Sequence, residues 1–204
     1  MESPPSIWRG PSIRLRALEP EDWEIYAAWN QDDDQALRLE AIPFPRSHAA
    51  MRRWAEEESL RHPENDRFRF VIETLAGEAI GDLTTHDCDR RVGTLSDCLN
   101  ILPTHRRRGY ASEAILRLLR YFFRELRYQK ATVGIFDFNL PSITLHEHLG
   151  FTLEGHLRHM TFSHGHFADL LMYGLTATEF IPLATSRAFP LDLSPSPTDE
   201  PASE

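Results

Sequence analysis

The pattern of apolar and polar positions predicts a strand near the start of the chain and a strong helix after its middle. Apolar and charged residues alternate in Ile13-Arg14-Leu15-Arg16, which is typical of a half-buried strand over 13–18. Apolar residues then recur at helical spacing along 111–126, at Ala111, Ile115, Leu118, Leu119, Phe122 and Leu126. This second segment is the clearest helix in the sequence.

Turn and capping residues place the remaining elements. Pro20 is expected to open a helix through about Asn30, and Ser47 to cap a helix that contains Met51, Trp54, Ala55 and Leu60. Further strands are expected over 68–74, 79–85, 94–102, 131–136, 152–158 and 167–175, with a short helix over 142–149. This order predicts an α/β protein with a mixed sheet in one domain over 11–180. Residues 1–10 are expected to form a flexible arm, and residues 187–204, rich in Pro, Ser, Asp and Glu, a disordered tail.

Composition narrows the class of protein. The 204 residues are 41% hydrophobic and 26% charged, as in a soluble globular domain, and no apolar run approaches the ~18 residues that would span a membrane. The first residues lack the features of a signal peptide, and two cysteines make no disulfide framework, so a cytoplasmic location is expected. A net charge of −9 disfavours DNA as a partner and suits a cationic one.

The most informative stretch lies between a predicted strand end and the strongest helix, in Thr104-His105-Arg106-Arg107-Arg108-Gly109-Tyr110-Ala111-Ser112. A helix N-terminus presents unpaired N–H groups and a partial positive charge, so it can bind phosphate. Gly109 lets the backbone approach an anion, and the arginines add positive charge. On these residues alone, a solvated basic face is an equally good interpretation.

Several motifs resemble those of the GNAT acetyltransferases. Arg106-x-x-Gly109-x-Ala111 is similar to the Gln/Arg-x-x-Gly-x-Gly/Ala pyrophosphate loop of that family. The order and spacing of the downstream motifs resemble the branch that includes the RimJ/RimL N-terminal acetyltransferases; these motifs are Asn139-x-x-Ser142, Leu149-Gly150-Phe151, Glu154-Gly155 and Asp169. The resemblance covers about residues 11–180.

The resemblance implies a GNAT fold, in which the strands before and after the long helix splay apart and hold acetyl-CoA. It implies that pantetheine binds the strand residues Leu99, Asn100 and Ile101, and that pyrophosphate binds the loop and first helical turn. The implied loop residues are Arg106, Arg107, Arg108, Gly109, Tyr110, Ala111 and Ser112. Asn139 and Ser142 are implied to contact the cofactor as well.

Acetyl transfer to an amine needs a neutral nucleophile and a proton for the departing thiolate. Many family members carry a tyrosine seven residues after the asparagine, where this sequence has His146. Imidazole donates a proton near neutral pH more readily than phenol, so His146 is the candidate acid, with packing as the alternative. Ser142 is a second candidate, and Asn139 is expected to bridge cofactor and acceptor. Asp97 could orient or deprotonate the amine through water, and Glu73 is a candidate for the same role.

Ten histidines raise the question of a metal site. His156, His159, His164 and His166 cluster near the last predicted hairpin, but without the closed spacing of a structural zinc site. No metal is therefore expected. Neither Cys88 nor Cys98 has an identifiable base, so neither is expected to be a nucleophile.

The sequence leaves the acceptor open. An acetyl-CoA-dependent N-acetyltransferase acting on a primary amine, such as the α-amine of a protein N-terminus, is the first hypothesis. Alternatives are acetylation of a small amine such as a polyamine or an aminoglycoside, and a non-catalytic CoA-binding module. A homodimer is suggested by family resemblance alone.

Overall fold

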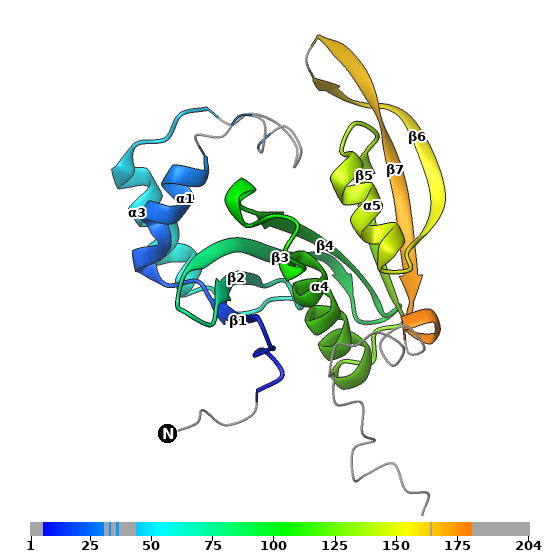
Figure 1. The fold of residues 1–204 in the computed structure, drawn as a ribbon, viewed down its shortest axis with the longest axis horizontal. Coiled ribbons are helices and arrows are strands. Elements are labelled where there is room, and N and C mark those ends of the chain that lie inside the picture. The colour runs from blue at the N-terminus through cyan, green and yellow to red at the C-terminus, as the bar shows by residue number, and fades with distance from the viewer. Residues whose placement is uncertain (1–5, 31–32, 34–35, 37–43, 164, 181–204) are drawn as a thin grey trace, which may run out of the picture.

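The computed structural model describes residues 6–30, 33, 36, 44–163 and 165–180. Its strands form one mixed sheet in the order β1-β2-β3-β4-β5-β7-β6 (Figure 1). Neighbouring strands are antiparallel except β4 and β5, which are parallel. The strands are β1 (Ile13–Ala17), β2 (Arg69–Thr74), β3 (Ala79–Asp89), β4 (Thr94–Ile101), β5 (Lys130–Phe136), β6 (Thr152–Ser163) and β7 (His166–Thr176). The predicted α/β mixed sheet is confirmed, although β3, β6 and β7 are longer than predicted.

The helices cover both faces of the sheet. On one face lie a 3-10 turn (Pro20–Asp22), α1 (Trp23–Trp29) and α3 (His48–Ser59). The Ser47 hydroxyl accepts from the N–H of Ala50 at 3.2 Å, which confirms the predicted cap of α3. On the other face lie α4 (Tyr110–Arg120), a single π-helical turn (Tyr121–Glu125) and α5 (Leu140–His148). In the described residues no helix is long and apolar enough to cross a membrane.

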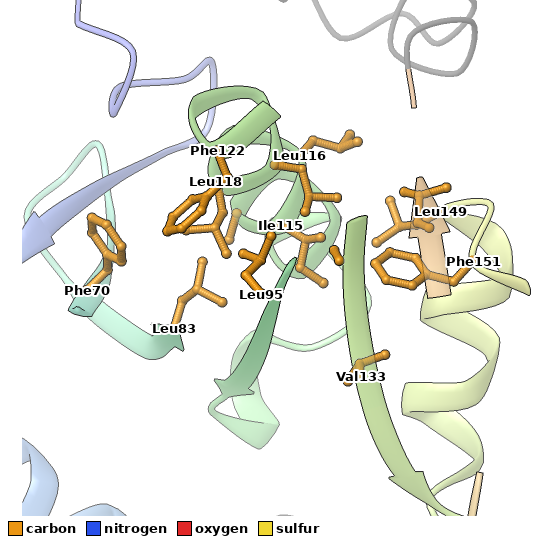
Figure 2. Close-up of a cluster of buried hydrophobic side chains, with 14 of the residues drawn as sticks. Phe70, Leu83, Leu95, Ile115, Leu116, Leu118, Phe122, Val133, Leu149 and Phe151 are labelled. Atoms are coloured by element: carbon orange, nitrogen blue, oxygen red, sulfur yellow. The ribbon is translucent and has the colours of Figure 1, made fainter. Parts of the chain in front are cut away.

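The main core lies between α4 and the sheet. Ile115, Leu118 and Leu119 are fully buried, and Figure 2 shows Leu83 and Leu95 pointing from the strands toward this helix. Burying each such side chain stabilises the fold by about 1.5–3 kcal/mol. Val71 points to the opposite face, where it packs with the second core formed by α1 and α3.

Residues 6–10, part of the arm predicted over 1–10, pack against the domain. Trp8 packs on Phe70 and Tyr121, with ring centroids 4.9 and 4.7 Å apart. The carbonyl of Trp8 accepts from the N–H of Leu15 at 2.8 Å, which extends the chain alongside β1. Residues 1–5 and the predicted tail over 187–204 lie outside the described residues.

Candidate active site

β4 and β5 are paired only where both strands begin. Thr94–Ser96 pairs with Lys130–Thr132, and beyond these residues the two strands diverge (Figure 1). β5 continues to pair with β7 as far as Phe136. In the part of the chain that the structure describes, β4 therefore has no strand partner on its β5 side from Asp97 to Ile101. This free edge contains Leu99, Asn100 and Ile101, the residues predicted to bind pantetheine.

The predicted phosphate loop connects the end of this edge to α4. Arg107 and Gly109 both adopt left-handed backbone conformations, with φ of 60° and 82°. Gly109 is the N-cap, and the first intrahelical bond runs from the N–H of Glu113 to its carbonyl at 3.0 Å. The N–H groups of the preceding first turn therefore have no helical acceptor. Left-handed residues beside a helix N-terminus are typical of anion-binding concavities.

The three arginines of the loop differ in what they contact. Arg106 donates from Nε to the carbonyl of Ile101 at 2.9 Å, so it ties the loop to the end of β4. Arg108 donates to the carbonyl of Thr104 at 3.3 Å, and both Arg107 and Arg108 are exposed. All three arginines are exposed, and Arg106 is in addition tied to the end of β4.

Asn139, Ser142 and His146 lie along α5, beside the diverging end of β5. Asn139 is the N-cap; its N–H donates to the carbonyl of Phe136 at 2.8 Å, and its own carbonyl accepts from Ser142 at 3.0 Å. His146 is 3% exposed, and its ring meets the ring of Phe151 edge-on at 5.0 Å. Its Nδ1 lies 2.8 Å from the carbonyl oxygen of Ser142, whereas its buried Nε2 has no partner among the described residues.

Asp97 is the first residue of β4 beyond the paired segment. It is 3% exposed, and neither carboxylate oxygen has a hydrogen-bond partner among the described residues. Burial raises the pKa of Asp97, while the charges of His146 and His86 oppose that shift. Asp97 on β4 and His146 on α5 are both buried, and both lack a partner for side-chain polar atoms among the described residues. Glu73 differs, because its carboxylate is paired with Arg14 and Arg16 on β1.

Comparison with known proteins identifies the family to which this chain belongs. Residues 12–152 match the family described as "Acetyltransferase (GNAT) domain". The chain belongs to the GNAT acetyltransferase family. A relative in Bacillus subtilis (strain 168), named an SPbeta prophage-derived uncharacterized N-acetyltransferase YokL, is 42% identical over 176 residues, covering 86% of this chain and 96% of the relative. The spermidine N(1)-acetyltransferase of Vibrio cholerae is 29% identical over 107 residues, covering 52% of this chain and 62% of that protein.

A solved structure shows the same GNAT fold. The spermidine N-acetyltransferase from Vibrio cholerae, in complex with CoA and spermine, superposes with a TM-score of 0.73 at 24% identity. The match covers 82% of this chain and 97% of that chain. This protein is accordingly an N-acetyltransferase that uses acetyl-CoA. The cofactor residues predicted in this GNAT chain lie along the free edge of β4, in the loop after it and at the start of α5.

A cluster of side chains that packs behind β4 in this GNAT domain could not be predicted from the sequence. Asp82 faces Asn100 across the β3–β4 pair. Asp82 also accepts from Arg69 at 2.5 Å, and the guanidinium of Arg69 lies over the rings of Tyr26 and Trp54. The cluster thereby connects α1 and α3 to the strand predicted to bind CoA. Its members come from separate elements along the chain, so no local spacing reveals it.

The remaining candidates do not gather into a site. His156 bonds Asp169 at 2.6 Å, and Asp169 also accepts from the N–H of His159 at 2.8 Å. His164 lies outside the described residues, and among the described ones no three His, Cys, Asp or Glu side chains could hold a metal ion together. Burial raises the pKa of the Cys88 thiol to about 11, which disfavours a thiolate nucleophile there.

Proposed function

We propose that this GNAT enzyme acetylates the free α-amine of a peptide or protein N-terminus, as in the RimJ/RimL branch. Acetyl-CoA would bind with its pantetheine along Leu99–Ile101 and its pyrophosphate at Arg106–Ser112, with Asn139 and Ser142 beside it. The observation that carries this proposal is the unpaired edge of β4, which leads directly into a loop with two left-handed residues at the N-terminus of α4.

The low pKa of an α-amine favours it as the acceptor, because it needs little help to lose a proton. Asp97 and His146 are the candidate proton-transfer groups, and burial raises the pKa of Asp97. An α-amine has a pKa of ~7.7–8.0, against ~10.4 for a lysine side chain. A substantial fraction of an α-amine is therefore neutral near pH 7, and it can attack the thioester directly.

A polyamine is the second candidate, because a relative is named a spermidine N(1)-acetyltransferase. A polycation requires carboxylates that are free to bind it. On the face covered by α1 and α3, Glu58 and Asp82 are both paired with Arg69. Glu58 is also paired with Arg61, so each of the two carboxylates already has a cationic partner, which supports the α-amine over the polyamine.

Mass spectrometry of acetyl transfer tests the choice of acceptor. The purified protein is incubated with acetyl-CoA and three acceptors: a peptide with a free N-terminus, the same peptide with a blocked N-terminus and an internal lysine, and spermidine. We expect acetylation of the first peptide only. Faster acetylation of spermidine would show that the acceptor is a polyamine and not an α-amine. Acetylation of the blocked peptide would indicate a lysine acceptor.

A further inference from the structure

A cavity with aromatic walls lies between β1, the chain that leads into β2, and the π-helical turn after α4. Its volume is about 260 Å³. Protein interiors contain few voids larger than a water molecule, and an apolar cavity of about 150 Å³ is large enough to bind benzene. The walls include the rings of Trp8, Phe68, Phe70, Tyr121 and Phe122, of which Phe70 and Phe122 are seen in Figure 2. The space is therefore that of a small-ligand site.

The rings of the wall are held in place by contacts with one another. Trp8 meets Phe70 and Tyr121 with ring centroids 4.9 and 4.7 Å apart. Phe68 meets Phe70 edge-on at 4.6 Å. Tilted and edge-on contacts of this kind are favourable for aromatic rings. Because a ring that turned into the cavity would lose these contacts, the walls keep the space open.

The π-helical turn (Tyr121–Glu125) forms one wall. The N–H of Leu126 donates to the carbonyl of Tyr121 at 3.3 Å, which is the bond between residues five apart that characterises such a turn. In an α-helix, residues five apart lie about 140° apart around the axis. Here both Tyr121 and Leu126 line the cavity. The wider turn thus adds to the apolar wall, and single π-helical turns are frequent at functional sites.

The charged side chains in the wall, Arg16 and Asp66, already have partners. Arg16 is paired with Asp22 at 2.7 Å and also with Glu73. Asp66 is paired with Arg90. A charged ligand would lose hydration without gaining an unpaired counter-charge among the described wall residues, which costs free energy. The walls therefore fit a neutral molecule.

The cavity has an exposed end and a buried end. Ala17 and Pro63 are exposed, whereas Phe70 and Phe122 are buried. A ligand could therefore enter beside Ala17 and place its ring against the buried aromatic side chains. The volume exceeds that of a benzene site by enough to hold a second fused ring.

We propose that this cavity binds a small neutral aromatic molecule of two fused rings, with the size and shape of indole. The site is separate from the proposed cofactor site. Tyr121 follows the C-terminal end of α4, whereas Gly109 is at its N-terminus, and the 11 residues between them span about 16 Å. The proposal therefore does not depend on the proposed acetyl transfer.

Calorimetry with indole as the probe tests the site in the full-length protein. We expect one equivalent to bind with a Kd below about 1 mM. Saturating acetyl-CoA should leave this Kd unchanged, because the two sites lie at opposite ends of α4. Lack of indole binding would refute the site, and competition by acetyl-CoA would place indole in the cofactor site instead. Indole-3-carboxylate should bind at least about tenfold more weakly, and equal affinity would contradict a neutral ligand.

Two matched variants locate the binding. Ala17 lies directly opposite Phe70 on β2 and lines the cavity, whereas Ala76 is exposed in the β2–β3 turn and does not. Ala17→Phe should raise the Kd for indole by at least about tenfold, because the added ring fills the space in front of Phe70. Ala76→Phe should bind as wild type does. Equal affinities in the two variants would show that indole binds elsewhere.

NMR tests the location without any substitution. In wild type, protons of bound indole should show nuclear Overhauser effects to the ring protons of Phe70 and Tyr121. Effects only to aromatic residues outside the cavity would overturn the proposal, even if the affinity were as expected. If indole bound only after residues 187–204 were deleted, the occupant would be the protein's own C-terminal segment, and the ligand proposal would be wrong.

Discussion

Arg117 donates to the carbonyl oxygen of Ile7 at 2.9 Å, so a buried cation on α4 holds the N-terminal segment against the domain. The same guanidinium contacts Glu113, whose carboxylate lies 3.4 Å from the N–H groups of Ser12 and Ile13. Both Arg117 and Glu113 are buried. This buried pair thus connects both sides of residues 8–11 to α4.

Removing the cation of this pair should destabilise the protein. Arg117→Met leaves Glu113 buried without its partner, a change that typically costs about 3–5 kcal/mol. Denaturant unfolding measures the loss. Arg124→Met, on the exposed side of the following turn, is the control and should change stability by less than about 0.5 kcal/mol. Equal losses in the two variants would contradict a stabilising role for the Arg117–Glu113 pair.

Gly10 should tolerate no side chain. A Cβ at this position would overlap Oε1 of Glu113 and the guanidinium of Arg117. Gly10→Ala therefore has to displace the buried pair, and we expect a loss of about 1–3 kcal/mol. The increase in mobility of Trp8 should appear as a change in tryptophan fluorescence at temperatures below the unfolding transition. Wild-type stability in this variant would show that the segment can shift at no cost.

The phosphate loop is tested by Gly109→Val with Gly77→Val as its matched control. Both glycines have positive φ, and at both a Cβ would find no atom within 4 Å, so the two variants bear a similar backbone cost of about 1–2 kcal/mol. Only Gly109 lies where the pyrophosphate is proposed to meet the backbone. Calorimetry should show the Kd for acetyl-CoA raised by about tenfold or more, roughly 1.4 kcal/mol, in Gly109→Val alone. Similar affinities in both variants would remove this loop from the proposed site.

Asp97→Asn should stabilise the protein at neutral pH. The raised pKa of Asp97 means that protonation favours the folded state, so the charged carboxylate costs stability above that pKa. We expect the variant to be more stable by about 1–3 kcal/mol at pH 7, with the difference shrinking as the pH falls. Unfolding curves at several pH values measure this. Asp137→Asn, at an exposed position, should show no such trend.

His146→Ala should lower kcat by roughly 10²–10⁴-fold, the range for general acid catalysis. The Kd for acetyl-CoA should stay within a few-fold, because the loop provides most of the binding. His146→Tyr restores a proton donor and should recover part of the rate. Imidazole loses its acidic proton at lower pH than phenol, so activity of the tyrosine variant should persist to higher pH. Normal turnover by His146→Ala would place the acid elsewhere, with Ser142 as the next candidate.

The sequence by itself determined the features that depend on local spacing. The apolar stripe of α4, the Ser47 cap and Gly109 at a helix start are each set by residues within a few positions of one another. A helix period or a cap can be read locally because the interacting groups are neighbours in the chain. The same locality made the order of strands and helices predictable.

Only the tertiary structure decided which of these residues meet. In the sequence, Asp97 is a single acidic residue in a predicted strand. Its burial follows from α4 and α5 covering that face of the sheet. The contact of Arg117 with Ile7 joins segments that are distant in sequence. Such contacts depend on strand register and on helix packing, which no local pattern encodes. For the same reason, the sequence predicts neither the burial of Asp97 nor the packing of Trp8 on Phe70.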